Sequence, residues 1–264
     1  MKRAILVAMA DEYPFKEIHE SLHSELEGLY KKYGFDVFYV YARKSSKLEK
    51  SIRRAIEEIR WGKFYLLLRI YDLLILSRFK YFIPNCTVQG KYIRVNVPED
   101  LRHLSIKILS SLEVIKNLEY DLVIRTTASS ILNPRLISIQ CSRIASLSNI
   151  YYGGKEIRQM DGFRFISGSF TILNRKAMNL LLNSRRRLDF SLIDDVCFGR
   201  LFKSNEISTE DLASINVEEV SSVPSLESIH ETFHFRCKSG TVNRNDLAVM
   251  QHLMRQIKKN ELNS

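Results

Sequence analysis

The sequence predicts an α/β fold in which a mixed, mostly parallel sheet is flanked by helices. The apolar run Ala4–Ala8 is typical of a buried strand. Residues 15–33 place Ile18, Leu22, Leu26 and Leu29 on one helical face, Gly34 ends that helix, and 35–41 forms a second strand. A strand–helix–strand opening of this kind predicts parallel pairing.

The alternation of strands and helices continues along the chain. A helix is predicted over 47–63, and another begins at Pro98 and runs to about Lys116. The remaining expected strands are 91–97, 120–125, 162–166, 170–173 and 232–238, and the remaining helices are 133–147, 174–184, a short one after Asp195, and 245–259. With five prolines and ten glycines the chain lacks a long flexible linker, so residues 1–264 are predicted to form a single domain.

The most apolar stretch, 64–76, is too short and too interrupted by charge to span a bilayer. Aromatic and basic residues flank it, so residues 61–82 fit either a helix buried under the sheet or a peripheral contact with a membrane surface. The sequence leaves both interpretations open.

The net charge of +10 fits either an anionic partner or an ordinary solvated basic surface. The four cysteines lack CxxC spacing, which indicates reduced, mostly buried thiols in a cytoplasmic compartment rather than metal ligands. The acidic residues that follow the first apolar run indicate a strand rather than a signal peptide.

Four short segments between about residues 90 and 200 are informative through their sequences and through the order in which they occur. They are HLSIKIL at 103–109, RTTASSILN at 125–133, ISGSFTILNRKAMNLLL at 166–182 and IDDVCFG at 193–199. Together they resemble the GT-A fold glycosyltransferases, especially the fringe-like and β-1,3-galactosyltransferase-like group with its bacterial and viral relatives. The resemblance implies a GT-A-like sheet, a nucleotide-sugar donor, and an acceptor hydroxyl on a glycan or a lipid-linked sugar.

The chain departs from this family at one important position. The two acids of the family's DxD motif, which hold a divalent ion such as Mn²⁺ against the donor diphosphate, fall on Thr127 and Ser129 here. Hard cations prefer carboxylates and water to hydroxyls. The sequence therefore predicts that no DxD-bound metal is required.

Asp194 and Asp195 are the candidates for the catalytic base, and the resemblance aligns Asp195 with the base of an inverting transferase. The alternative is that an aspartate caps the helix that follows. The departing diphosphate needs cations, and His234, Arg236 and Lys238 alternate along an expected strand, which would place them on one face. The solvent side of an edge strand is the competing interpretation.

Further candidates for donor binding are Lys107, Arg125 and Asp11, and a structural salt bridge is the alternative for Arg125. The hydroxyls of Thr126, Thr127, Ser129 and Ser130 follow the strand end and suit ribose or phosphate, or else a cap for the next helix. Ser167, Gly168 and Ser169 would admit a sugar close to the backbone, or else form a bulge or turn.

Three functions remain open from the sequence. The preferred one is a cytoplasmic, inverting, metal-independent glycosyltransferase that touches the inner face of a membrane. The second is an inactive GT-A-like binding protein, which the missing acids favour. The third is a nucleic-acid-binding protein, but no stacking platform or known motif supports a nucleic-acid partner. The sequence does not determine an oligomeric state.

Overall fold

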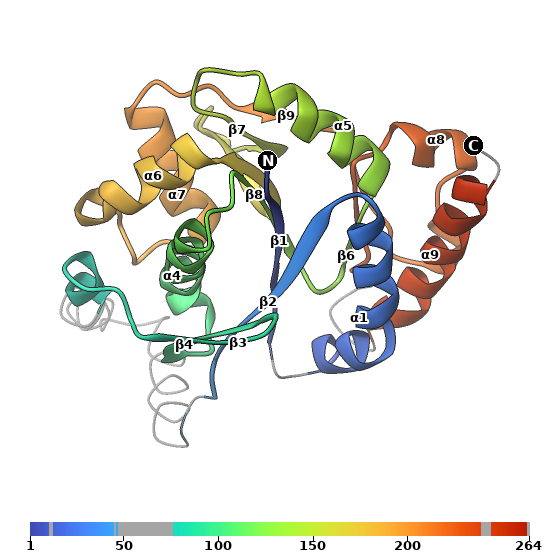
Figure 1. Ribbon diagram of the computed structural model, residues 1–264, viewed down its shortest axis with the longest axis horizontal. Coiled ribbons are helices and arrows are strands. Elements are labelled where there is room, and N and C mark those ends of the chain that lie inside the picture. Colours follow the sequence, from blue (N-terminus) through green and yellow to red (C-terminus); the bar gives the residue numbers. More distant parts are fainter. Residues whose placement is uncertain (11–12, 45, 47–75, 239–243, 263–264) are drawn as a thin grey trace.

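An eight-stranded mixed sheet forms the centre of the protein, in the order β3-β4-β2-β1-β5-β8-β7-β9. The computed structural model describes residues 1–10, 13–44, 46, 76–238 and 244–262 (Figure 1). The strands of this sheet are β1 (Arg3–Ala8), β2 (Phe35–Arg43), β3 (Cys86–Gln89), β4 (Tyr92–Pro98), β5 (Leu122–Thr127), β7 (Tyr152–Arg158), β8 (Arg164–Asn174) and β9 (Glu210–Asp211).

The parallel core of the sheet consists of β4, β2, β1 and β5, and it confirms the parallel pairing predicted from the sequence. Ala8 at the end of β1 pairs with Val40 on one side and Thr127 on the other. The first apolar run is thus the central strand of a sheet. Strands β3, β8 and β7 add antiparallel pairings, so the sheet is mixed as expected.

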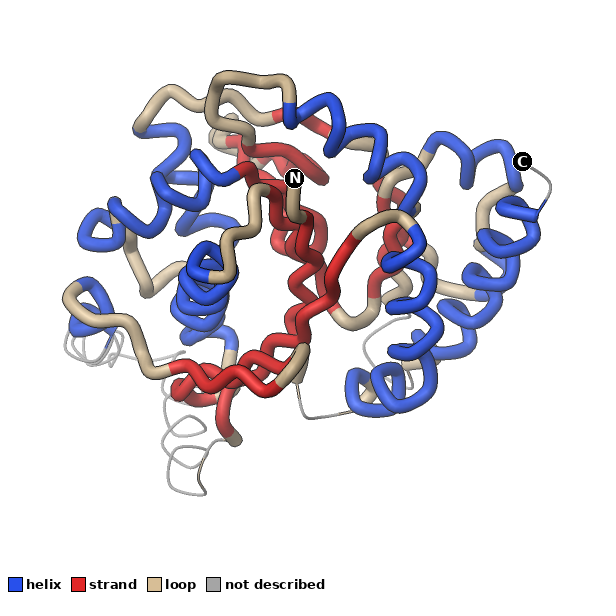
Figure 2. Tube along the Cα trace, viewed as in Figure 1, coloured by secondary structure: helices blue, strands red, loops and turns tan. Residues whose placement is uncertain are grey.

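Helices cover both faces of the sheet, and each face carries its own hydrophobic core (Figures 1 and 2). One face packs against α1 (Phe15–Lys32), α5 (Pro134–Ala145) and α9 (Asp246–Leu262). The other packs against α4 (Leu104–Asn117), α6 (Arg175–Asn183) and α7 (Asp194–Ser204). Short 3-10 helices are η2 (Ser77–Lys80), η3 (Leu101–His103), η4 (Arg185–Arg187) and η5 (Val220–Ser222).

A second, three-stranded sheet has the order β10-β11-β6. Its strands are β6 (Ser130–Leu132), β10 (Ser214–Asn216) and β11 (His234–Arg236), and α8 (Leu226–Glu231) precedes β11. β11 is antiparallel to β6 and parallel to β10. The predicted strand 232–238 is therefore shorter than expected, and Lys238 lies beyond its end.

Two predicted elements differ in the structure. Pro98 closes β4 instead of opening a helix, and the chain then passes through η3, where the Asp100 carboxylate accepts a hydrogen bond from His103 N at 2.9 Å, before α4 begins. The two strands expected around Ser167–Ser169 are one strand, β8, interrupted by a bulge. Between paired positions Gly154↔Thr171 and Glu156↔Ile166, β7 advances two residues while β8 advances five.

Gly154 permits this bulge. Its φ is +142°, and a Cβ there would lie 2.1 Å from the carbonyl oxygen of Phe170. Only glycine fits this conformation and this distance together. The bulge carries Ser167–Ser169 past the end of β5, where the ladder of the two strands stops at Thr126↔Phe170.

Gly28 offers a direct stability prediction, because it sits exposed inside α1 with no atom near the position of an added Cβ. Alanine loses less backbone entropy than glycine on helix formation. We expect Gly28→Ala to raise the free energy of unfolding by about 0.5–1 kcal/mol in urea titrations. Gly34→Ala is the matched contrast, since its φ of +79° opposes a side chain, and it should be destabilising. Equal effects of the two changes would contradict this interpretation.

The predicted helix 47–63 and most of the apolar run 64–76 lie outside the described residues. At the described end of that run, Leu76 and Phe79 are buried, whereas Tyr81 and Phe82 are 70% and 48% exposed. No helix in the described part of the chain is long and apolar enough to cross a membrane. All four cysteines are free, and Cys141, Cys197 and Cys237 are buried, as the sequence predicts.

Candidate functional site

Segments that are far apart in the sequence meet at the edge of the sheet where the parallel strands end. β1 and β5 end side by side at Ala8 and Thr127, and the bulge of β8 lies just beyond them. Arg236 of β11 reaches the same edge, because it pairs with Ser130 of β6, three residues after β5. In open α/β sheets this edge is where ligands bind.

Arg125 and Asp194 form a buried ion pair at this edge. Arg125 Nη2 lies 2.8 Å from Asp194 Oδ2, and both side chains are about 5% exposed. Burial raises the pKa of the Asp194 carboxyl above its ordinary value, and the Arg125 guanidinium opposes that rise. Arg125 thus forms the structural salt bridge that the sequence left open as the alternative to donor binding.

Gly168 holds the guanidinium of Arg125 in place. A Cβ at this position would lie 2.1 Å from Arg125 Nη1, so the guanidinium rests directly against the backbone of the β8 bulge. The backbone N–H of Gly168 donates to Asp195 Oδ2 at 3.2 Å. Gly168 thus contacts Arg125 with its Cα side and Asp195 with its N–H, which fixes the two charged groups relative to each other.

Asp195 is partly exposed, in contrast to its neighbour Asp194. Its Oδ1 accepts from the backbone N–H of Val196 at 2.8 Å, while Oδ2 accepts from Gly168. The N-cap of α7 is Ile193, and both aspartates lie in the first helical turn, so the capping interpretation is wrong. The carboxylate of Asp195 is held between α7 and the bulge with part of its surface open to a ligand.

Lys107 lies in the protein interior. It is 2% exposed, and its Nζ donates to Glu99 Oε1 at 2.8 Å, to Glu99 Oε2 at 2.9 Å and to the carbonyl of Met9. Burial lowers the pKa of Lys107, and Glu99 offsets part of that shift. With three N–H groups and three acceptors, the ammonium fastens the end of β1 to α4 and has no N–H left for a donor nucleotide.

The hydroxyls that follow β5 are bonded to one another and to His234. Thr126 Oγ1 donates to the carbonyl of Ser169 at 3.0 Å. Thr127 and Ser130 share a hydrogen bond of 2.9 Å, and Ser130 Oγ lies 3.0 Å from His234 Nε2. Asn133, not a hydroxyl, caps α5 by accepting from Leu136 N at 3.3 Å. Ser129 is buried and its carbonyl accepts from Cys237 N.

His234 completes this chain of polar groups. Its Nδ1 lies 2.7 Å from Ser214 Oγ, and its ring stacks on Phe170 at 5.0 Å. The residue is 0% exposed, and burial lowers its pKa to about 3, with further lowering by Lys155 and Arg236. The imidazole is therefore neutral at physiological pH. It lies inside the protein and does not share one open face with Arg236 and the exposed Lys238.

The buried imidazole has a measurable consequence for stability. The unfolded chain takes up a proton on His234 below about pH 6.5, whereas the folded chain does so only near pH 3. The free energy of unfolding should therefore fall by several kcal/mol as the pH drops from about 6.5 toward 3, and this contribution is fully present above that window.

Urea titrations between pH 7.5 and pH 4.5 measure this effect. His234→Gln keeps hydrogen-bonding groups but cannot titrate, so its unfolding free energy should depend less on pH than that of the wild type. An identical pH dependence in both proteins would contradict the assignment of a neutral, buried imidazole.

A divalent cation does not fit the position that the family's DxD motif would occupy. Thr127 and Ser129 offer hydroxyls only, and that of Thr127 already bonds Ser130. Within the residues that the structure describes, no three His, Cys, Asp or Glu side chains gather as a metal site requires. The local chemistry thus differs from that of a carboxylate-held metal.

Arg236 is a cation at this edge for which the described part of the chain provides no ion-pair partner. It is half-buried, its Nε is buried without a hydrogen-bond acceptor, and the described residues give it no ion pair. Burial lowers the pKa of Arg236, Arg125 and Arg244 lower it further, and Asp195 and Asp246 raise it. The charges of Arg125, Arg244, Asp195 and Asp246 thus all act on Arg236. An unpaired, half-buried guanidinium is a site for an anion.

Arg244 and Lys155 are two further cations near Arg236 that the sequence did not single out. Arg244 pairs with the buried Asp246, with Nε 3.3 Å from Oδ1. Lys155 on β7 donates to Asn216 Oδ1 at 3.1 Å. Nothing in the local sequence distinguishes either residue from other surface cations, because tertiary packing brings them together. Asp11, predicted to contact the donor, lies outside the described residues.

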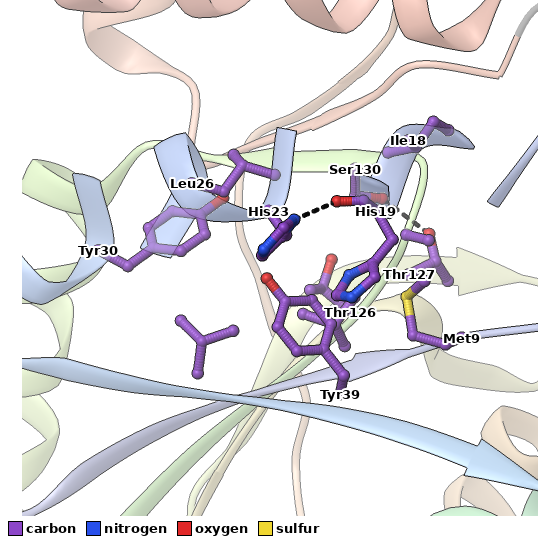
Figure 3. A pocket seen from close by; sticks show the side chains of 13 residues that line it. Met9, Ile18, His19, His23, Leu26, Tyr30, Tyr39, Thr126, Thr127 and Ser130 are labelled. Carbon is purple, nitrogen blue, oxygen red and sulfur yellow. Dashed lines mark hydrogen bonds between the residues drawn. The ribbon is translucent and has the colours of Figure 1, made fainter. Parts of the chain in front are cut away.

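A small pocket of about 20 Å³ lies behind the end of β5, between α1 and the sheet (Figure 3). Figure 3 shows His19 and His23 of α1 above Tyr39 of β2, with Ser130 and Thr127 beside His19. The two imidazoles stack at 4.6 Å, and His19 Nδ1 is buried without a partner. Burial, followed by His23, lowers the pKa of His19. The volume suits about one water molecule, so this pocket is too small for a nucleotide.

Comparison with known proteins gives similarity to solved structures at low sequence identity. No protein-family model matches the chain, and no curated protein sequence matches it. A glycosyltransferase involved in glycosylation of the major capsid of PBCV-1 is similar to this chain at 11% identity and a TM-score of 0.45, covering 97% of this chain and 100% of that one. The galactosyltransferase LgtC, solved with donor and acceptor sugar analogues, is similar at 10% identity and a TM-score of 0.43, and the match covers 97% of this chain and 95% of that one. Mouse xyloside xylosyltransferase 1 is similar at 11% identity and a TM-score of 0.39, and the match covers 92% of this chain and 99% of that one.

Proposed function

We propose that this protein transfers a sugar from a nucleotide-sugar donor to an acceptor hydroxyl, with inversion and without a metal bound at Thr127 and Ser129. The observation that carries the proposal is the half-buried Arg236, which has no ion pair among the described residues and lies at the same ligand-binding edge of the sheet as the partly exposed Asp195. The four sequence segments that resemble GT-A glycosyltransferases supply the reaction class, and three of them contribute Arg125, Gly168, Asp194 and Asp195 to this edge.

The chemistry follows from the roles that these groups suit. The Asp195 carboxylate accepts the proton of the acceptor hydroxyl as its oxygen attacks the anomeric carbon. The bond from that carbon to the nucleoside diphosphate breaks, and its electron pair leaves with the diphosphate. The Arg236 guanidinium stabilises the negative charge that develops on the departing oxygen. The Arg125–Asp194 pair helps to position Asp195, because the backbone of Gly168 contacts the Arg125 guanidinium and its N–H donates to Asp195.

Nucleotide binding tests the role of Arg236. Charged hydrogen bonds contribute about 1.5–3 kcal/mol, so we expect Arg236→Gln to weaken binding of nucleoside diphosphates by about ten- to hundredfold. Isothermal titration calorimetry with UDP, GDP, CDP, ADP and dTDP, with Mn²⁺ or with EDTA, measures the effect and any metal dependence. Arg200→Gln, on the exposed side of α7, is the matched control.

Failure of every nucleotide to bind the wild-type protein would overturn the proposal. Binding that requires Mn²⁺ would overturn its metal-independent part. If Arg236→Gln and the wild type bound nucleoside diphosphates with equal affinity, Arg236 would be excluded as a donor-binding residue.

A second candidate, an inactive GT-A-like binding protein, draws support from the closed chain Thr127–Ser130–His234–Ser214. Of the two hydroxyls that replace the family's acids, that of Thr127 is bonded within the protein. Nucleotide-sugar binding without transfer or donor hydrolysis, with or without chelator, would favour this candidate over the enzyme.

We also propose that the protein works in the cytoplasm and touches an acidic membrane surface with the described end of residues 61–82. Exposed Tyr81 and Phe82 lie beside the basic segment Arg185–Arg187, and the Arg186 guanidinium lies 5.8 Å from the centre of the Tyr81 ring. Aromatic and basic side chains together suit the interface of an anionic bilayer. The free cysteines suit a reducing compartment, and a lipid-linked acceptor would fit this location.

A further inference from the structure

A polar pocket of about 490 Å³ lies between the two sheets, away from the small pocket of Figure 3. Its walls come from both sheets and from the loop and helix that join them. The lining residues are Lys155 and Glu156 of β7, Asp211 and Leu212 at β9, Ala213, Ser214 and Ile215 at β10, and Ser228, Glu231 and Thr232 at α8. This volume accommodates a small organic ligand.

One end of this pocket adjoins the candidate donor site. Lys155 in its wall donates to Asn216 Oδ1 at 3.1 Å, and Asn216 is the partner of Arg236 in the β10–β11 ladder. Burial lowers the pKa of Lys155, and the charge of Arg236 lowers it further. Ser214, another lining residue, bonds His234. A ligand in the pocket would therefore lie close to the strand that carries Arg236.

The charge of the pocket is opposite to that of the donor site. Its formal charges are +1 from Lys155 and −3 from Glu156, Asp211 and Glu231. Arg164 lies 3.3 Å from Glu156 and offsets one of these acids. The lining combines hydroxyls and carboxylates with the apolar residues Leu212 and Ile215. Closely spaced polar groups beside an apolar wall suit a sugar ring, whose hydroxyls donate to carboxylates and whose C–H face is apolar.

We propose that this pocket, lined by residues 155–156, 211–215, 228 and 231–232, binds the acceptor as a neutral or amino-bearing sugar and disfavours acidic sugars. The inference rests on the proposed function, because it assigns the second substrate of the same site. The acidic lining repels a sugar carboxylate, whereas an amino sugar gains a charged partner. The donor diphosphate and the acceptor sugar would thus bind at two neighbouring sites whose charges are opposite.

Ala213 gives a clean way to block the pocket. It lines the pocket, its side chain is exposed, and it is not part of the proposed donor site. Ala213→Trp fills the space with an indole ring, and Ala213→Ser leaves it open. Saturation-transfer NMR with methyl glucoside, methyl galactoside, methyl glucosaminide and methyl glucuronide measures sugar binding without any nucleotide.

We expect the neutral and amino glycosides to bind the wild type and Ala213→Ser at least about tenfold more tightly than the glucuronide, since like charges in close contact are costly. Ala213→Trp should abolish sugar binding while its affinity for nucleoside diphosphates stays at the wild-type value. Asp211→Asn should narrow the difference between the glucoside and the glucuronide.

The outcomes separate this inference from the proposed function. Nucleotide binding with no sugar binding, or sugar binding that survives Ala213→Trp, would overturn the acceptor pocket and leave the proposed function standing. Sugar binding that Ala213→Trp removes, in a protein that binds no nucleotide, would support the pocket and overturn the proposed function. A glucuronide that binds as tightly as the glucoside would overturn the charge-based selectivity.

Discussion

Asp195→Asn is expected to lower the rate of sugar transfer by about 10²- to 10⁴-fold, the usual contribution of a positioned general base. The amide oxygen of asparagine can still accept from the Gly168 N–H, which Asp195 Oδ2 now accepts at 3.2 Å, so the local structure should persist. What is lost is the ability to take a proton. Nucleotide affinity should change little, because the diphosphate contact belongs to Arg236.

The measurement is transfer from a binding nucleotide sugar to the best acceptor glycoside, with kcat and donor affinity determined separately. Asp189→Asn is the matched control: it makes the same change six residues earlier at an exposed position and should retain wild-type turnover. Full turnover by Asp195→Asn would exclude Asp195 as the base. Loss of turnover together with loss of nucleotide binding would point to a structural role instead.

Arg125→Met should be the most destabilising of the single changes considered for this site, by about 3–5 kcal/mol, because it leaves the Asp194 carboxylate buried without a counter-charge. Arg125 and Asp194 are each about 5% exposed at a separation of 2.8 Å, so water cannot replace the missing partner. Asp194→Leu should be destabilising for the complementary reason. The double variant should cost clearly less than the sum of the two single changes.

Urea unfolding of the four proteins gives the coupling energy of the pair. The exposed pair Lys258–Glu25, also at about 2.9 Å but with side chains 47% and 52% exposed, is the internal reference. Its removal by Lys258→Met should cost less than about 1 kcal/mol. Additive effects of the Arg125 and Asp194 changes would show that the buried charges do not stabilise each other.

Much of the fold follows from local sequence patterns. The apolar run of β1, the amphipathic period of α1 and the apolar run of β2 each mark one element, and the parallel pairing follows from their order. Strands β3, β6, β7, β9 and β10 escaped prediction, and three of them, β6, β9 and β10, have only two or three residues. Their sequences carry no period, and their conformation is set by strands that arrive from elsewhere in the chain.

The site was only partly predictable for a related reason. Sequence patterns drew attention to Arg125, Asp195 and Arg236, and the structure brings these three to one edge. They did not reveal that Lys107 and His234 are enclosed by their partners, because Glu99, Ser130 and Ser214 become partners only on folding. The alternation of side chains along β11 predicted that His234 and Arg236 share one face. In the structure His234 is fully buried, whereas Arg236 is half-buried, so the two side chains have different surroundings.

The position of β11 in the small sheet also bears on protein synthesis. β11 inserts between β6, which directly follows β5, and β10, so the small sheet cannot be completed until residues 234–236 have emerged. Because a nascent chain emerges from its N-terminus onward, Gly168 and Asp195 leave the ribosome before Arg236 does. A growing chain would therefore hold the proposed base without the proposed phosphate-binding cation, and competence for the donor would be acquired only near the end of translation.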